Sequence, residues 1–281
     1  MISTHGGYNN RLARIDLTNE KITYDLCDEG DISKFVGGRG LGSKYLWDVR
    51  EESRDRFGVF VGPLTGTGIP LANRLTFVFH SPLTNTIAYT NTGGYAGTAL
   101  KLAGFDGLTV SGRSSRPKYI LVKKGEITLV GGDWLWGKRA TDTMNALREK
   151  HGDVRVLSIG PAGENMVRYA NVVNDSGRAS GVRHGVGCLL GGMNLKAIAI
   201  SSDYGLRVSV ANKDRFRELL VKLNKKLQNS PLLNRDTGSF SIYGTPLAVE
   251  PLIQHEALPV KNYSCSPPYE GNLNPGISLK A

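Results

Sequence analysis

Glycines crowd residues 62–107, and this stretch constrains the fold of the chain more than any other feature. Two of its glycine runs, 62–68 and 91–97, fall where a strand would end and a helix would begin. Glycine has no Cβ, so the bare amides of such turns can approach a ligand closely. Arg74 directly precedes the apolar run 75–79, which predicts an arginine at the start of a buried strand. A guanidinium beside two glycine turns predicts a site for a phosphate-bearing ligand.

A second glycine-rich loop, residues 174–187, carries Arg178, Arg183 and His184 among four glycines. If both loops bind phosphate through arginines and bare amides, they indicate two anionic groups or one large anionic cofactor. Taken alone, either loop could equally be a set of tight turns in a strand-rich domain.

The glycine run 37–42 does not match a standard nucleotide motif. A Walker A loop requires Lys and then Ser or Thr after its last glycine, whereas Ser43 here precedes Lys44. The GxGxxG pattern also fails, because Ser43 stands where its third glycine belongs. Tight entry into a helix, or backbone contact with another ligand, remains open.

Alternation of apolar and polar residues predicts many short strands, and 3.6-residue spacing predicts a few helices. We therefore expect an α+β fold: an N-terminal domain of antiparallel sheets over residues 1–208, then the beginning of an incomplete helical domain over residues 209–281. The expected strands are 11–17, 22–26, 75–79, 107–111, 118–123, 126–130, 154–159, 166–173 and 195–200, and the expected helices are 32–49, 141–150 and 212–228.

Half of the net charge of +10 comes from residues 211–235, where seven Lys and Arg stand against two acidic residues. This segment is typical of an amphipathic helix with a solvated basic face, and alternatively of a surface for an acidic partner or nucleic acid. Because no aromatic base-stacking pattern accompanies the charge, we expect no nucleic-acid partner.

The cysteines and the apolar runs bear on location. Cys27, Cys188 and Cys265 lie far apart and form no CxxC pair, so they predict neither a disulfide framework nor a metal site. The sequence has no run of about 18 apolar residues and no leader-like start, so we expect a cytoplasmic protein without membrane contact.

Eight ordered blocks resemble the tungsten-containing aldehyde ferredoxin oxidoreductase family, and the resemblance covers roughly residues 8–202. The blocks are Phe35-Val36-Gly37-Gly38-Arg39-Gly40, Gly62-Pro63-Leu64-Thr65-Gly66-Thr67, Ser81-Pro82-Leu83-Thr84, Asn91-Thr92-Gly93-Gly94-Tyr95, Lys101-Leu102-Ala103-Gly104-Phe105-Asp106, Trp136-Gly137-Lys138, Ile159-Gly160-Pro161-Ala162-Gly163-Glu164-Asn165 and Asn194-Leu195-Lys196-Ala197-Ile198.

The resemblance implies that the N-terminal domain is a base for a metal bis-pterin. Arg74 matches an arginine that bridges the pterin toward an iron–sulfur cluster, and the carbonyls of Asn91 and Ala179 match ligands of a Mg²⁺ ion that links the pterin phosphates. The implied cofactor-binding residues are Asn73, Arg74, Asn91, Gly93, Gly94, Tyr95, Arg178, Ala179, Gly181 and Arg183.

The implied activity is oxidation of an aldehyde to a carboxylic acid at tungsten or molybdenum, with electrons leaving through a [4Fe–4S] cluster to ferredoxin. We expect the cluster ligands and the catalytic residues outside this chain, which would be inactive alone and would need a partner chain with the missing domains, or a homodimer. The alternative is a non-catalytic metallopterin-binding scaffold subunit of a split enzyme. His184 replaces a glycine of the family pattern, and its role is open.

Overall fold

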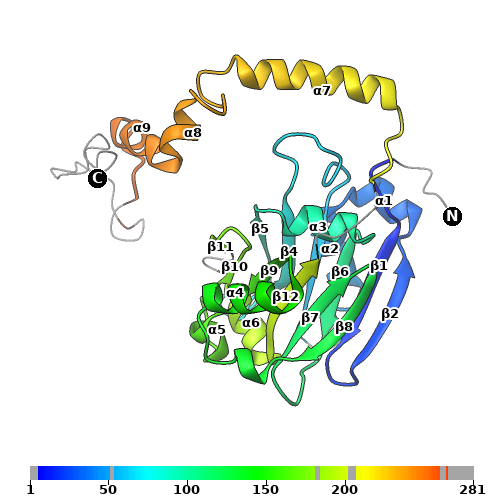
Figure 1. Ribbon diagram of the computed structural model, residues 1–281. Coiled ribbons are helices and arrows are strands. Elements are labelled where there is room, and N and C mark those ends of the chain that lie inside the picture. Colours follow the sequence, from blue (N-terminus) through cyan, green and yellow to red (C-terminus); the bar gives the residue numbers. More distant parts are fainter. Residues whose placement is uncertain (1–5, 51–53, 181–183, 202–206, 260–263, 265–281) are drawn as a thin grey trace. The chain divides into compact units, whose positions relative to one another are not determined.

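The computed structural model describes residues 6–50, 54–180, 184–201, 207–259 and 264. The chain divides into two compact units, residues 1–212 and residues 213–281. The first unit contains two six-stranded sheets, here called sheet A and sheet B (Figure 1). Each unit is described by itself below.

Sheet A has the strand order β2-β1-β6-β3-β4-β5. Its neighbouring strands are antiparallel except β1 and β6, which are parallel with Leu12 opposite Gly107. A tight hairpin joins β1 to β2, as the alternating pattern predicts. The strands are β1 (Arg11–Asp16), β2 (Lys21–Leu26), β3 (Arg56–Val61), β4 (Leu75–His80), β5 (Ile87–Thr92) and β6 (Gly107–Ser111).

Sheet B has the order β11-β10-β9-β12-β7-β8. Here too one pair, β7 and β12, is parallel and the other neighbours are antiparallel. The expectation of mainly antiparallel sheets is confirmed, with one parallel pair in each sheet. The strands are β7 (Lys118–Lys123), β8 (Glu126–Gly131), β9 (Val154–Ser158), β10 (Val172–Val173), β11 (Ala179–Ser180) and β12 (Leu195–Ser201).

The two sheets share one hydrophobic core. Side chains such as Phe57 and Phe77 of sheet A and Ile120 and Ile198 of sheet B belong to the same buried cluster. Helix α3 (Ala96–Leu102) contacts β3 of sheet A and also β9 and β12 of sheet B. This explains the apolar runs, because strands buried on both faces lose the polar alternation of a half-exposed strand.

Helices α1 (Glu29–Phe35) and α2 (Gly38–Asp48) pack on sheet A around Leu12, Leu41 and Phe60. A Cβ on Gly42 would lie 2.7 Å from Val78 Cγ2 and 2.8 Å from Phe60 Cδ2, so α2 approaches the sheet closely. The glycine run 37–42 therefore serves helix packing at this position. No ligand is needed to explain Gly42.

The remaining elements of the first unit accompany sheet B. They are a 3-10 turn η1 (Asp133–Leu135) and the helices α4 (Ala140–His151), α5 (Pro161–Glu164) and α6 (Val186–Gly192). Helix α4 contacts β9, and α5 and α6 contact each other. Arg139 is the N-cap residue of α4, and its side chain makes no capping hydrogen bond. The strand expected at 166–173 is wrong except for Val172–Val173, because turns occupy the other residues.

The second unit begins with the 16-residue helix α7 (Lys213–Gln228), as its periodicity predicts. None of the residues of α7 is buried. It is followed by α8 (Ser239–Tyr243), η2 (Thr245–Ala248) and α9 (Val249–Gln254). No helix in the described ranges is long and apolar enough to cross a membrane.

Candidate cofactor site

Three turns far apart in the sequence meet at one end of sheet A. The strand register pairs Val61 with Leu75 and Leu75 with Thr92. The segments that follow β3, precede β4 and follow β5 therefore lie at the same end of sheet A. The side-chain amide of Asn73 donates to the carbonyl of Gly94 at 2.5 Å. Asn91 Oδ1 accepts from Thr76 Oγ1 at 2.8 Å. The turn before β4 and the turn after β5, residues 93–95, are therefore held together.

The second glycine-rich loop reaches the same place through Asn174. Its Nδ2 donates to Thr92 Oγ1 at 2.9 Å and to the Gly93 carbonyl at 3.3 Å. Its Oδ1 accepts from the amides of Ser176 and Arg178, both at 3.0 Å. Asn174 therefore shapes its own turn, residues 174–178, and fastens that turn to residues 92–93, about 80 positions earlier.

Asp175 makes the second link. Its carboxylate accepts from the Tyr95 amide, 2.9 Å from Oδ2, and from the Ala96 amide, 3.4 Å from Oδ1. A Cβ on Gly94, whose φ is +79°, would collide with Asp175 Oδ1, so this turn needs glycine on two grounds. The link places an internal anion at the start of α3.

Two arginines and two amides remain available beside these links. Arg74 and Arg178 are exposed, and neither guanidinium has a hydrogen-bond or ion-pair partner among the residues that the structure describes. Arg74 Nη1 lies 3.8 Å from the position that a Cβ on Gly93 would take. The amides of Gly93 and Gly94 likewise donate to no acceptor within the described ranges. A free guanidinium beside free glycine amides, with a second free arginine on the turn bonded to them, is a donor set suited to phosphate oxygens.

The other predicted residues are placed less uniformly. Ala179 lies in β11 opposite Val173 and is exposed, and Asn91 is an exposed residue of β5. The Tyr95 amide is already taken by Asp175, and its side chain is 60% exposed with the Arg155 guanidinium 5.5 Å from the ring centroid. Gly181, Arg183 and Cys265 lie outside the described residues.

His184 is anchored through its backbone, because its carbonyl accepts from Ser81 Oγ at 2.7 Å. Its Nδ1 is buried and has no hydrogen-bond partner among the described atoms. The described part of the chain contains no group of three or more His, Cys, Asp or Glu side chains that could hold a metal ion. A metal in this region would therefore need backbone carbonyls or ligands from elsewhere.

Asn174 and Asp175 are functional candidates that the sequence reasoning missed. Both are almost fully buried, at 1% and 9% exposure, inside a loop that reads as polar. Asn and Asp side chains commonly bond nearby backbone in turns. The signal available in the sequence was their position directly before Ser176-Gly177-Arg178. That position did not show which distant groups the two side chains would contact.

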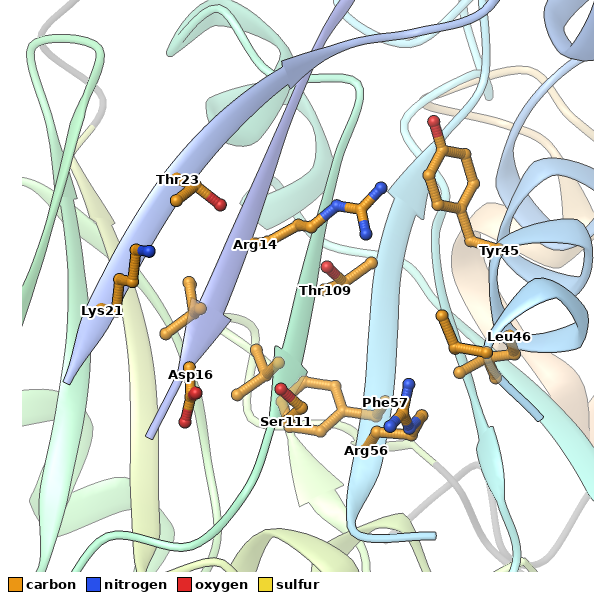
Figure 2. Close-up of a pocket in the computed structure, with 13 residues that line it drawn as sticks. Arg14, Asp16, Lys21, Thr23, Tyr45, Leu46, Arg56, Phe57, Thr109 and Ser111 are labelled. Atoms are coloured by element: carbon orange, nitrogen blue, oxygen red, sulfur yellow. The ribbon is translucent and has the colours of Figure 1, made fainter. Parts of the chain in front are cut away.

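A separate pocket of about 270 Å³ lies at the opposite end of sheet A (Figure 2). Four adjacent strands line it in register: Arg14 stands between Thr23 and Thr109, and Asp16 stands between Lys21 and Ser111. Tyr45 and Leu46 of α2 form its wall, and burial raises the pKa of the Tyr45 hydroxyl.

Two charged residues of this pocket are bonded to neighbours outside its lining. Arg14 pairs with Asp25 outside the pocket lining. Hydrogen bonds from Asn19 and the Thr18 amide lower the pKa of Asp16, so it stays ionised. None of the predicted cofactor residues lines the pocket. The candidate site is therefore the three-turn cluster, defined as the turns at 73–74, 93–95 and 174–178.

Comparison with known proteins identifies the family of this chain. The model of the family described as "Aldehyde ferredoxin oxidoreductase, N-terminal domain" matches residues 12–202, which include all three turns. The chain belongs to the aldehyde ferredoxin oxidoreductase family. The resemblance read from the eight sequence blocks is thereby confirmed.

The family relatives include tungsten-containing aldehyde ferredoxin oxidoreductases. That of Pyrococcus abyssi is 37% identical over 265 residues, which are 92% of this chain and 43% of the relative. That of Pyrococcus furiosus is 36% identical over 261 residues, 90% of this chain and 42% of the relative. The chain thus spans less than half the length of these relatives.

Two further matches come from multi-component enzymes. The aliphatic sulfonate oxidoreductase, WOR-like subunit, of Pyrococcus furiosus is 30% identical over 243 residues, covering 78% of this chain and 38% of the relative. A solved structure described as the active site complex BamBC of benzoyl coenzyme A reductase, in complex with 1,5-dienoyl-CoA, superposes with a TM-score of 0.75 at 27% identity. That match covers 79% of this chain and 35% of the other chain, and it supports the α+β fold.

Proposed function

We propose that this chain is the cofactor-binding portion of an aldehyde:ferredoxin oxidoreductase that holds a tungsten or molybdenum bis-pterin. Family membership and the tungsten-containing relatives support the class of cofactor. The observation that carries the proposal is the convergence of the three-turn cluster, in which Arg74, the Gly93–Gly94 amides and Arg178 lie on turns joined by Asn73 and Asn174.

The residues present fit the phosphates of such a cofactor. Arg74 and Arg178 would donate in forks to phosphate oxygens, and the Gly93 and Gly94 amides would complete the donor set. The carbonyls of Asn91 and Ala179 would hold Mg²⁺ between the phosphates, since hard cations prefer oxygen ligands. Gly181 and Arg183, which lie outside the described residues, belong to the same proposed phosphate site.

The proposal gives the cofactor and this chain different roles. The metal centre supplies the redox chemistry by which an aldehyde becomes a carboxylic acid. This chain binds and orients the cofactor from one side, while Arg74 places a positive charge beside it. The [4Fe–4S] cluster and transfer to ferredoxin belong to the same proposal, with ligands expected outside this chain.

Metal and pterin analysis tests the proposal. The full-length protein, purified without oxygen from cells supplied with tungstate and molybdate, should contain about one metal and two pterins per chain. Reduction of a ferredoxin or a viologen dye by added aldehydes checks the activity. A full-length protein that contains neither metal nor pterin would rule the function out.

A second candidate is a non-catalytic metallopterin-binding scaffold that works with a partner chain. It is favoured by the two relatives from multi-component enzymes, one named a subunit and one a two-part complex. Affinity purification from the native source separates the two candidates. The scaffold predicts a separate, stoichiometric partner chain that carries the cluster, whereas the leading proposal predicts that residues 1–281 and the cluster ligands belong to one polypeptide.

A further inference from the structure

Asp175 is a buried carboxylate whose charge is met by backbone amides. Its side chain accepts from the amides of Tyr95 and Ala96, and it forms no ion pair within the described part of the chain. A buried carboxylate is costly unless it accepts hydrogen bonds. These contacts therefore form a specific link across 80 positions of sequence.

Asn174 completes this link from the other side. Asn174 donates to Thr92 and Gly93, and Asp175 accepts from Tyr95. The two residues therefore contact the turn 93–95 both before and after Gly94. The same Asn174 accepts from the amide of Arg178, so it also fixes the backbone that carries this arginine.

Arg148 anchors the link to the other half of the unit. From helix α4, which packs on β9 of sheet B, its Nη2 donates to the Asp175 carbonyl at 2.9 Å. The first turn, 93–95, continues from β5 of sheet A. Asn174 and Asp175 therefore tie a turn of sheet A to the framework of sheet B.

We propose that Asn174 and Asp175 are positioning residues that preassemble the phosphate-binding turns and decide which amides a phosphate can use. Asp175 occupies the amides of Tyr95 and Ala96, so the amides of Gly93 and Gly94 are the ones in this turn that stay without an acceptor among the described residues. This inference rests on the proposed function, since it concerns the same cofactor. It assigns to two residues a role that the family resemblance did not imply.

The physical gain is preorganisation. Two unconnected loops would each lose conformational freedom when they close on a cofactor, and that loss weakens binding. Five side-chain hydrogen-bond contacts already join residues 174–175 to residues 92–96 in the folded chain. These loops have therefore lost that conformational freedom on folding, before any cofactor binds. Removing the link should therefore lower cofactor retention clearly while it changes the stability of the fold only a little.

The test compares Asp175→Ala with Asp28→Ala in the full-length protein. Asp28 also accepts a backbone amide at a helix start, that of Asp31 at 2.9 Å in α1, but it lies outside the three-turn cluster. The first measurement is hydrogen exchange, by mass spectrometry, of peptides that contain residues 92–96 in cofactor-free protein. The second is the metal and pterin content of protein loaded in cells.

Asp175→Ala should speed exchange at residues 95–96 by roughly tenfold or more, because a bond to a charged acceptor is lost. Its cofactor content should fall at least about threefold below that of Asp28→Ala, with similar unfolding midpoints. Asp175→Asn keeps the size and one acceptor oxygen, so it should give intermediate values, and it replaces the alanine variant if that one does not fold.

Unchanged exchange at residues 95–96 would overturn the link, and faster exchange with normal cofactor content would overturn the positioning role. If the wild-type protein itself holds no metal or pterin, the proposed function fails, whereas the exchange measurement still reports on the link. The two failures are thus distinguishable.

Discussion

Lys101 and Asp106 form an ion pair in which both side chains are shielded from water, at 0% and 1% exposure. The pair joins the end of α3 to the start of β6, and burial lowers the pKa of the Lys101 ammonium. Asp106 also accepts from the Asn9 amide at 2.9 Å, and Asn9 Nδ2 donates to the Lys101 carbonyl at 2.7 Å. The sequence block Lys101–Asp106 is therefore explained by a buried ion pair and its hydrogen bonds.

Replacing Lys101 by Met should destabilise the first unit by about 3–5 kcal/mol, because it leaves the Asp106 carboxylate buried without its cation. Urea denaturation gives the change in unfolding free energy. Arg139→Ala is the control: it breaks an exposed ion pair with Asp142 and should cost less than about 1 kcal/mol. The double variant Lys101→Met/Asp106→Leu should recover much of the loss, and no recovery would contradict this account.

Gly94→Ala should destabilise the protein more than Gly137→Ala. Both glycines have positive φ, +79° and +85°, so either alanine meets backbone strain of about 1–2 kcal/mol. A Cβ at Gly137 has no neighbour within 4 Å, whereas one at Gly94 collides with Asp175. Thermal unfolding should show an additional loss for Gly94→Ala, together with faster exchange at residues 95–96. Equal losses would mean that the Asp175 contact adjusts freely.

Arg74→Ala and Arg178→Ala should each lower the metal and pterin content roughly tenfold, because each removes charge-assisted bonds to phosphate. Both side chains are exposed, so the unfolding free energy should change by less than about 0.5 kcal/mol. Arg113→Ala, at another exposed arginine of the same unit, provides the control. Normal cofactor content in both variants would remove these arginines from the proposed site.

Stability should fall on mild acidification, in part through His151. Burial, with Lys150 and Lys123 nearby, lowers the pKa of His151, and its Nε2 lies 2.9 Å from the Tyr119 hydroxyl. The unfolded chain then binds more protons than the folded chain, so the unfolding free energy declines as pH falls below about 6.5 and levels off below the folded pKa. Denaturation at several pH values should show a shallower decline for His151→Gln than for the wild type.

Local periodicity predicted many of the individual elements of this protein but missed others, among them β3 (Arg56–Val61), β5 (Ile87–Thr92) and α3 (Ala96–Leu102). The alternation in residues 11–17 and 22–26 predicted the β1–β2 hairpin, and the leucine spacing after Asn212 predicted α7. Both patterns work because burial of one face repeats every two residues in a strand and every 3.6 in a helix. Sequence patterns failed at residues 166–173. Their apolar residues predicted a strand, but residues 166–171 form turns and irregular structure.

The sequence alone also predicted two anion sites, at the two glycine-rich loops that carry arginines. This prediction needs only local properties: glycine lets backbone amides approach a ligand, and arginine donates to anions. Their meeting is a property of the tertiary structure. Parallel pairing of β1 with β6 and of β7 with β12 arranges the sheets, and α3 lies against both of them. Only then does Asp175 accept from the Tyr95 amide and Asn174 donate to the Thr92 hydroxyl, both about 80 residues away, and such contacts depend on distances in the folded chain that no local pattern encodes.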